Sequence, residues 1–127
     1  LSHLNDFRAF MSSGGYLTNV NASSILYDAY NIDDFTSGGI ENLDGISTDN
    51  ALLREILEER YITLFGQIEV FNDTRRTENE SIVRVPVTPN TGNVLPQRFI
   101  YPQSEIDRNS NTPNPIPNFF DKTPVNQ

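Results

Sequence analysis

All eight prolines of this 127-residue chain lie between Pro86 and Pro124. Proline has no backbone N–H and its ring clashes with the preceding helical turn, so it interrupts helices. Long helices are therefore expected only in the first two-thirds of the chain. From Pro102 onward the chain is also rich in Asn and Ser. We expect a long irregular tail there, with a single helical turn over Pro102–Glu105, because proline suits the first position of a helix.

The first predicted helix covers residues 1–13. Its apolar residues recur every three or four positions, which is typical of a helix with one buried face. They are Leu1, Leu4, Phe7 and Met11. The pair Gly14–Gly15 follows, and glycine readily takes the left-handed conformation that ends a helix. No Ser, Thr, Asp or Asn precedes Leu1 as a cap, which favours a fragment of a longer protein over a natural N-terminus.

Residues 14–50 form a polar excursion with many Gly, Asn and Asp residues. A short helix capped by Asn21 is expected within it, because five residues have helical spacing. They are Ala22, Ile25, Leu26, Ala29 and Tyr30. Connections of this length are uncommon between packed helices. The sequence therefore predicts an excursion that is either functional or mobile.

The strongest helical pattern covers residues 51–76. One apolar stripe recurs at steps of three and four residues, as in a helix that packs on a core. The stripe consists of Leu53, Leu57, Tyr61, Leu64, Ile68 and Phe71, and Leu52 and Ile56 widen it. Gly66 lies inside this segment, and two alternatives stay open: a continuous helix, or a kink or break at Gly66.

A period of two replaces the helical period after residue 77. Alternate residues are apolar and β-branched, which predicts a short strand. They are Val83, Val85 and Val87. A turn cluster over Pro89–Gly92 and a return strand over Arg98–Tyr101 would complete a two-stranded element. The fold class expected from these patterns is mainly α.

Composition and residue types exclude several functions. The formal charge is −8, with a single Lys and no Cys. Nucleic-acid backbones are bound by clustered cations, so nucleic acid is not an expected partner. The absence of cysteine excludes disulfides and thiol nucleophiles. His3, the only histidine, is expected on a helix surface.

The neighbouring carboxylates Glu58 and Glu59 also give no catalytic pair. Adjacent side chains on a helix diverge by about 100°, so they cannot flank one glycosidic bond. We expect no enzymatic activity, and we predict that Glu58–Glu59–Arg60 is a charged helix surface with one ion pair. Asp73 with Arg75 and Arg76 is likewise predicted to end a helix, because cations are favoured there.

Acidic residues are concentrated in the excursion, where no Lys or Arg occurs between Arg8 and Arg54. They are Asp28, Asp33, Asp34, Glu41, Asp44 and Asp49. Carboxylate oxygens are the ligands that calcium prefers, but their spacing does not follow the EF-hand loop. We therefore expect a solvated acidic loop and no cofactor, with calcium as the alternative.

Three segments together resemble the SusD/RagB-like family. Glu59–Arg60–Tyr61 followed by Phe71–Asn72–Asp73–Thr74–Arg75–Arg76 is similar to the family's "ERR…F-D-L-R-R" helix. Leu4–Asn5–Asp6–Phe7–Arg8–Ala9 is similar to the helix that usually precedes it. The family's near-terminal "I-P-Q-S-E-I…N…N-P" segment is matched by Pro102–Asp107, Asn109 and Asn114–Pro115. The order and approximate distances of the segments agree over most of the chain.

Some positions depart from the family pattern. Ile68 stands where the family often has Gly, and Gly66 lies two places earlier. Thr63 replaces a common Glu, and the connection over residues 12–50 is longer than usual.

The resemblance implies that residues 1–127 are the C-terminal portion of a larger, mostly helical surface lipoprotein. The helices here would be the last of its tetratricopeptide-like helices. Such proteins lie on the outer face of the outer membrane in Bacteroidetes-type bacteria, held by an N-terminal lipid anchor that this chain does not contain. They capture oligosaccharides, or oligopeptides in some members, for a SusC-like TonB-dependent transporter. The implied partners are that transporter, the glycan or peptide, and the N-terminal remainder of the same protein.

Aromatic residues of the excursion are the predicted ligand contacts, because sugar faces and peptide side chains stack on aromatic rings. They are Tyr16, Tyr27, Tyr30 and Phe35. The alternative is that Tyr27 and Tyr30 pack a short helix onto the main helix. The matching alternative for the function is a structural or adhesive surface segment without a small ligand.

Overall fold

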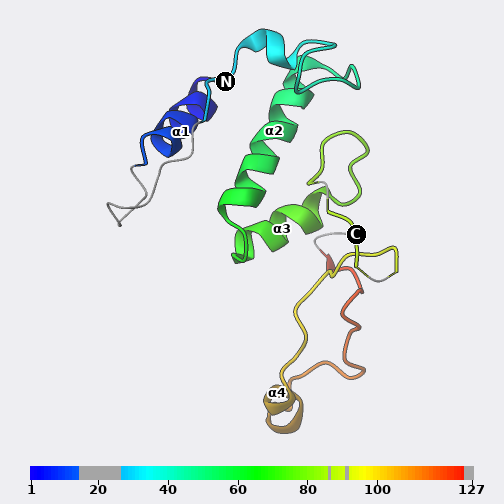
Figure 1. The fold of residues 1–127 in the computed structure, drawn as a ribbon. Helices are drawn as coiled ribbons and strands as arrows, with labels where there is room; N and C mark the ends of the chain where they lie inside the picture. The colour runs from blue at the N-terminus through cyan, green and yellow to red at the C-terminus, as the bar shows by residue number, and fades with distance from the viewer. Residues whose placement is uncertain (15–26, 86, 91, 125–127) are drawn as a thin grey trace. The chain divides into compact units, whose positions relative to one another are not determined.

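The computed structural model of the chain describes residues 1–14, 27–85, 87–90 and 92–124. These residues form helices α1 (Ser2–Ser12), α2 (Thr48–Thr63), α3 (Ile68–Thr77) and α4 (Gln103–Arg108) and the 3-10 helix η1 (Ile32–Phe35) (Figure 1). The described part contains no strand. The prediction of a mainly α chain is therefore confirmed. No helix within the described ranges is long and apolar enough to cross a lipid bilayer.

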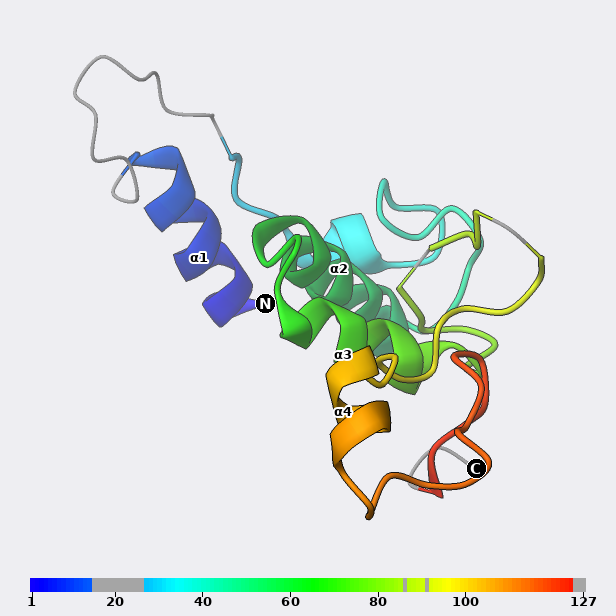
Figure 2. The ribbon, with the colours of Figure 1, turned by 90° about the horizontal axis from the view of Figure 1, so that it is seen from below.

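The chain divides into two compact units, Leu1–Arg60 and Tyr61–Gln127. In the first unit, α1 lies beside α2 (Figure 2), and the core contains Leu4, Phe35 and Ala51. The Phe35 side chain and Ala51 are both fully buried. Ala51 leaves room on α2 for a large ring, and burying a Phe side chain contributes about 2–3 kcal/mol.

The buried face of α2 differs from the predicted stripe. Leu53 is 47% exposed, whereas Ala51, Glu55 and Glu59 are buried at four-residue intervals. The prediction that Glu59 is a surface charge is therefore wrong. The physical reason is that partners far away in the sequence bind Glu55 and Glu59, so that a partly polar face of α2 turns inward.

The described part of the predicted helix over residues 21–30 is not helical. Residues 27–31 have no regular structure, and the rest lies outside the described residues. Asn5 of α1 explains this conformation, because its side-chain oxygen accepts from the Tyr30 N–H at 2.9 Å and its amide donates to the Tyr30 carbonyl at 2.9 Å. The Asp28 carbonyl accepts from Arg8 Nε at 2.7 Å. Backbone groups that a helix would need are thus bound to side chains of α1.

A buried asparagine organises the loop of residues 36–46, hereafter the 36–46 loop. Asn42 is fully buried, and its amide donates to the carbonyls of Phe35 at 2.8 Å and Ile46 at 2.7 Å. Its side-chain oxygen accepts from the Ile46 N–H at 2.9 Å. One side chain therefore satisfies three backbone groups that would otherwise be buried without partners.

Glycines end two helices. Gly14 follows α1 with a φ of 69°, as predicted, and its N–H donates to the Met11 carbonyl at 3.1 Å. Gly66 has a φ of 83° and lies between α2 and α3. Other residues rarely adopt this conformation, so Gly66 permits the change of direction. Of the two alternatives for residues 51–76, the break at Gly66 is the one observed.

The two-stranded element predicted over Val83–Val87 and Arg98–Tyr101 is not formed by the described residues of these segments. Backbone donors of the first segment are used locally. The Val85 N–H donates to Thr77 Oγ1 at 3.2 Å, and the Val87 N–H donates back to the Val85 carbonyl at 2.8 Å. Apolar residues therefore alternate along this segment although its described residues do not pair with a second strand.

Gln97 connects the parts of the second unit. It is 1% exposed, and its side-chain amide donates to Glu78 just after α3. Its carbonyl accepts from Arg75 Nη1 at 3.1 Å, and its N–H donates to the Phe119 carbonyl at 3.1 Å. The coil is thereby tied to α3 by side chains rather than by a sheet.

The proline-rich tail is irregular apart from α4, which lies away from α3 at the tip of a long stretch of coil (Figure 1). Pro102 stands at the N-cap of α4, one position before the predicted start, and the helix extends beyond the predicted turn to Arg108. Glu105 stabilises the end of this helix, because its side chain accepts from Asn109 at 2.8 Å and its carbonyl accepts from Thr112 Oγ1 at 3.0 Å.

Replacing Asn42 by Ala should destabilise the protein, because three buried backbone groups lose their partner. We expect the free energy of unfolding to fall by about 2–4 kcal/mol, measured by urea denaturation. Asn79→Ala makes the same change at an exposed position after α3 and should alter stability by no more than about 0.5 kcal/mol. Equal stability of the two variants would contradict the role assigned to Asn42.

Candidate functional site

The first unit contains a cluster of polar and aromatic side chains, hereafter the Tyr30 cluster. It consists of Arg8, Tyr27, Tyr30, Glu41, Glu55 and Glu59. The cluster brings together α1, the segment before η1, the 36–46 loop and α2. Of these residues, only Tyr27 and Tyr30 belong to the ligand contacts predicted from the sequence.

Arg8 holds one side of the cluster. Its Nη1 atom lies 2.5 Å from Glu59 Oε1, and both side chains are largely buried, with exposures of 13% and 9%. The guanidinium also lies over two rings, 4.0 Å from the Tyr30 centroid and 5.2 Å from the Tyr27 centroid. Cation–π contacts of this kind are stronger when they are desolvated. The positive charge of Arg8 is thus balanced both by a carboxylate and by aromatic faces.

The Tyr30 hydroxyl holds the other side of the cluster. Its oxygen lies 3.0 Å from Glu41 Oε1 and 2.9 Å from Glu55 Oε1. Burial raises the pKa of Tyr30, and the hydrogen bonds and charges of the two carboxylates raise it further. Burial also raises the pKa of Glu55; the hydrogen bond from Tyr30 opposes this, and the charges of neighbouring glutamates reinforce it. The phenol therefore stays protonated, and Glu55 holds its proton more tightly than an ordinary glutamate.

This arrangement does not present two carboxylates to a substrate. The Tyr30 oxygen lies within hydrogen-bond distance of both Glu41 and Glu55, so it fills the space in which a scissile bond would have to lie. The ring of Tyr30 also packs edge-on against Phe35, with centroids 5.2 Å apart. The chemistry that the cluster supports is attachment of the 36–46 loop to α2.

The predicted ligand contacts therefore lie in different environments. Phe35 is fully buried in the core and is not accessible to a ligand. Tyr30 is partly buried, with its hydroxyl and its ring both engaged. Tyr27 is partly exposed and touches Arg8. Tyr16 lies outside the described residues. Of the three described residues, Tyr27 is half-buried and contacts the cluster through the Arg8 guanidinium.

Three of the acidic residues considered for calcium, Asp34, Glu41 and Asp44, have different partners. Asp44 accepts from Arg54 at 2.7 Å and 3.1 Å, and this hydrogen bond lowers the pKa of Asp44. Asp34 accepts from the Asn31 N–H at 2.7 Å at the start of η1. Within the described ranges, no three His, Cys, Asp or Glu residues are grouped so that they could hold a metal ion.

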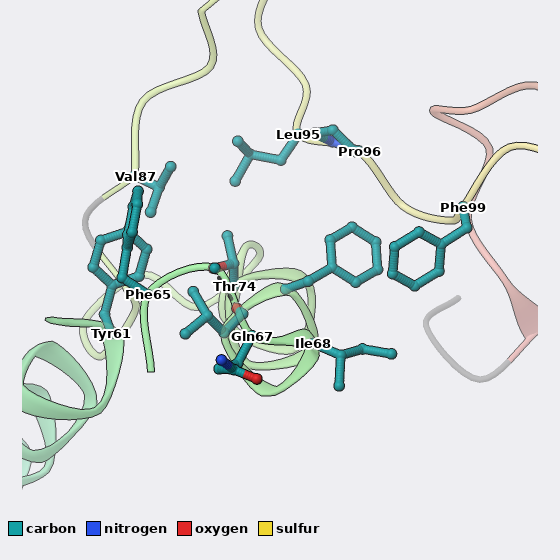
Figure 3. A pocket seen from close by; sticks show the side chains of 12 residues that line it. Tyr61, Phe65, Gln67, Ile68, Thr74, Val87, Leu95, Pro96 and Phe99 are labelled. Carbon is teal, nitrogen blue, oxygen red and sulfur yellow. Dashed lines mark hydrogen bonds between the residues drawn. The ribbon is translucent and has the colours of Figure 1, made fainter. Parts of the chain in front are cut away.

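The second unit contains an apolar pocket that was not predicted. Figure 3 shows Tyr61 and Phe65 on one side, Phe99 on the other, and Leu95 and Pro96 above α3. The Phe99 ring lies 4.7 Å from the ring of Phe71 in α3. The pocket volume of about 530 Å³ falls within the range of small-molecule sites. Gln67 is one of few polar side chains in it, so the pocket offers apolar contact with little to fix the orientation of a ligand.

Comparisons with known proteins provide no further assignment. No protein-family model matches the chain, and no curated protein or solved structure shows a significant match to it. The SusD/RagB-like resemblance therefore depends on the sequence motifs alone.

Sequence reasoning did not identify Arg8, Glu55 and Glu59 as members of one cluster. A signal was present, because Glu55 and Glu59 lie four residues apart and share a helix face with Ala51. Carboxylates on the same face as a small apolar residue indicate a buried polar contact. Their partner Arg8 is 51 residues from Glu59, and nothing in the local pattern identifies a partner at that distance.

Replacing Glu59 by Gln should destabilise the protein more than breaking the exposed ion pair does. The variant leaves the buried Arg8 charge without its carboxylate, and we expect a loss of about 3 kcal/mol in the free energy of unfolding. Asp44→Asn removes a carboxylate from Arg54 at a position that is 52% exposed, and it should have little effect. Urea denaturation of both variants measures the difference, and similar losses would contradict the structural role of Arg8 and Glu59.

Proposed function

We propose that this chain is the C-terminal portion of a SusD/RagB-like nutrient-binding protein. In this proposal the whole protein captures an oligosaccharide, or an oligopeptide, at the outer face of the outer membrane. It then delivers the ligand to a SusC-like TonB-dependent transporter. The chain contributes helical scaffold and part of the ligand-facing surface.

The observation that carries the proposal is the ion pair between Arg8 and Glu59. Arg8 belongs to the segment Leu4–Ala9, and Glu59 to the segment Glu59–Arg60–Tyr61, so two of the segments that resemble the family meet at this contact. Both side chains are largely buried, and removing one partner of a buried ion pair is strongly destabilising, so the fold depends on this contact. Helices α1 and α2, which this pair joins, are in this proposal the last tetratricopeptide-like helices of a larger scaffold.

Other residues of the motifs also make contacts within the fold. Arg75, in Phe71–Arg76, donates to the Gln97 carbonyl and to Asn72 Oδ1. Glu105, in Pro102–Asp107, binds Asn109 and Thr112. These contacts support a structural role for the motifs. A binding role then falls to residues between them.

A structural or adhesive segment without a small ligand is the second candidate function. Two observations favour it, because Phe35 is fully buried and Tyr30 is held by the Tyr30 cluster. Both aromatic residues are therefore used by the fold. Tyr27, which remains partly exposed, distinguishes the two candidates.

Tyr27→Ala in the full protein should weaken ligand binding and lower the melting temperature only slightly, because the Tyr27 ring lies farther from the Arg8 guanidinium than the Tyr30 ring does. Stacking on one aromatic ring contributes about 0.5–1.5 kcal/mol, which corresponds to a loss of about 2- to 12-fold in affinity. Tyr30→Phe is the matched control. It keeps the ring and removes the hydroxyl from Glu41 and Glu55, so the melting temperature should change and the affinity should not. Calorimetry with a panel of oligosaccharides and oligopeptides measures both quantities.

Copurification tests the proposed partner. The full protein, tagged and expressed with the TonB-dependent transporter encoded beside it, should be recovered as a complex with that transporter. Absence of a complex together with no binding to any member of the panel would favour the structural or adhesive function instead.

A further inference from the structure

The Tyr30 hydroxyl contacts two carboxyl groups but has one hydrogen for both contacts. Glu41 and Glu55 both lie within hydrogen-bond distance of the Tyr30 hydroxyl, at 3.0 Å and 2.9 Å. A phenol has only one hydrogen to donate, and an ionised carboxylate has none. With both carboxyl groups ionised, Tyr30 can donate fully to only one of them, and both contacts become full hydrogen bonds when one carboxyl group carries a proton. Glu55 can then donate to the Tyr30 oxygen while Tyr30 donates to Glu41.

No neighbouring cation described in the structure is paired with the Glu41 or Glu55 carboxyl group. From α1, the guanidinium of Arg8 faces Tyr30 but is bonded to Glu59. From the 36–46 loop come Glu41 itself and Asp44. Arg54 of α2 binds Asp44 and also donates to the Glu41 backbone carbonyl at 2.9 Å, so it holds the loop to α2 without pairing with the Glu41 carboxylate. From α2, Glu58 and Glu59 add negative charge near Glu55. Both arginines are thus engaged by other carboxylates, and like charges surround Glu55.

We propose that Glu55, Tyr30 and Glu41 form a proton-dependent clamp that adds to the Arg54 contacts in fastening the 36–46 loop to α2 and that loosens as the pH rises. Glu41 belongs to the loop and Glu55 to the helix, so the shared proton connects two elements. When Glu55 loses this proton, two carboxylates face one hydroxyl, and repulsion between them favours detachment of the loop. The clamp is independent of the proposed function, because it depends only on the geometry of the first unit.

The direction of the pH effect follows from linkage. Burial raises the pKa of Glu55 in the closed form, and detachment would return it toward the ordinary glutamate value of about 4.3. Between these two values the closed form binds more protons than the open form. Raising the pH through this window therefore shifts the equilibrium toward the open loop, by up to about tenfold per pH unit for one proton.

Amide hydrogen exchange of the full chain tests the clamp. The N–H groups of Gly38 and Glu41 are bonded within the first unit, to the Asn42 and Asp34 carbonyls. Their protection, corrected for the intrinsic rates and compared with amides of α3, should fall by up to about tenfold per pH unit within the window. In Glu55→Gln the amide mimics the protonated acid, so protection should stay high and independent of pH. Glu80→Gln, at an exposed position, should keep the pH dependence of the parent chain.

Two further measurements separate the clamp from a general loosening of the chain at high pH. Tyr30→Phe removes the shared hydroxyl, so loop protection should be low at every pH while α3 amides keep theirs. Carbon-13 titration of the Glu55 carboxyl group should give a midpoint above that of Glu80. A parent chain with constant loop protection, a Glu55→Gln variant with the parent's pH dependence, or equal midpoints for Glu55 and Glu80 would each overturn the proposal.

Discussion

The first unit depends on the contacts of the Arg8 guanidinium. It reaches from α1 to the Glu59 carboxylate on α2, to the Asp28 carbonyl, and over the Tyr30 ring. Three segments that are distant in the sequence therefore share one side chain. Because Arg8 is largely buried, each of these contacts is made in an environment where an unpaired charge would be costly. The positions of Tyr30 and of the buried face of α2 follow from this requirement.

Polar contacts of this kind compensate for a small apolar core. Only 36% of the residues are hydrophobic, and the core of the first unit contains Leu4, Phe35 and Ala51. The Asn42 amide and the Tyr30 cluster supply specific contacts where apolar packing is limited. Gln97 has a similar role in the second unit, where its hydrogen bonds connect α3 with the coil. Buried amides define a geometry more sharply than apolar side chains do, because each of their donors and acceptors needs a partner.

Most of the helices and the buried Leu4 of α1 could be predicted from local patterns, whereas the buried face of α2 could not. Proline positions and apolar periodicity placed α1, the α2–α3 segment and α4, because helix formation depends on neighbouring residues. The inward turn of Glu59 depends on Arg8, 51 residues away. The strand predicted from Val83, Val85 and Val87 is not formed by these residues, and there the competing partner is close in sequence, since the Thr77 hydroxyl binds the Val85 N–H. Of the predicted ligand contacts, Phe35 is buried in the core and Tyr30 is bound to Glu41 and Glu55. The prediction considered only the ability of their rings to stack on a ligand.

The excess of acidic residues explains why, in the proposed clamp, Glu55 keeps its proton. The chain has 17 Asp and Glu residues against 9 Lys and Arg, so arginines cannot neutralise every carboxylate that folding brings inward. Arg8 balances Glu59, and Arg54 balances Asp44. Glu41 and Glu55 instead share a neutral hydroxyl. A buried carboxylate without a cation is stabilised by keeping its proton. The Tyr30 hydroxyl thus replaces a missing counter-ion, and it does so only as long as that proton is retained.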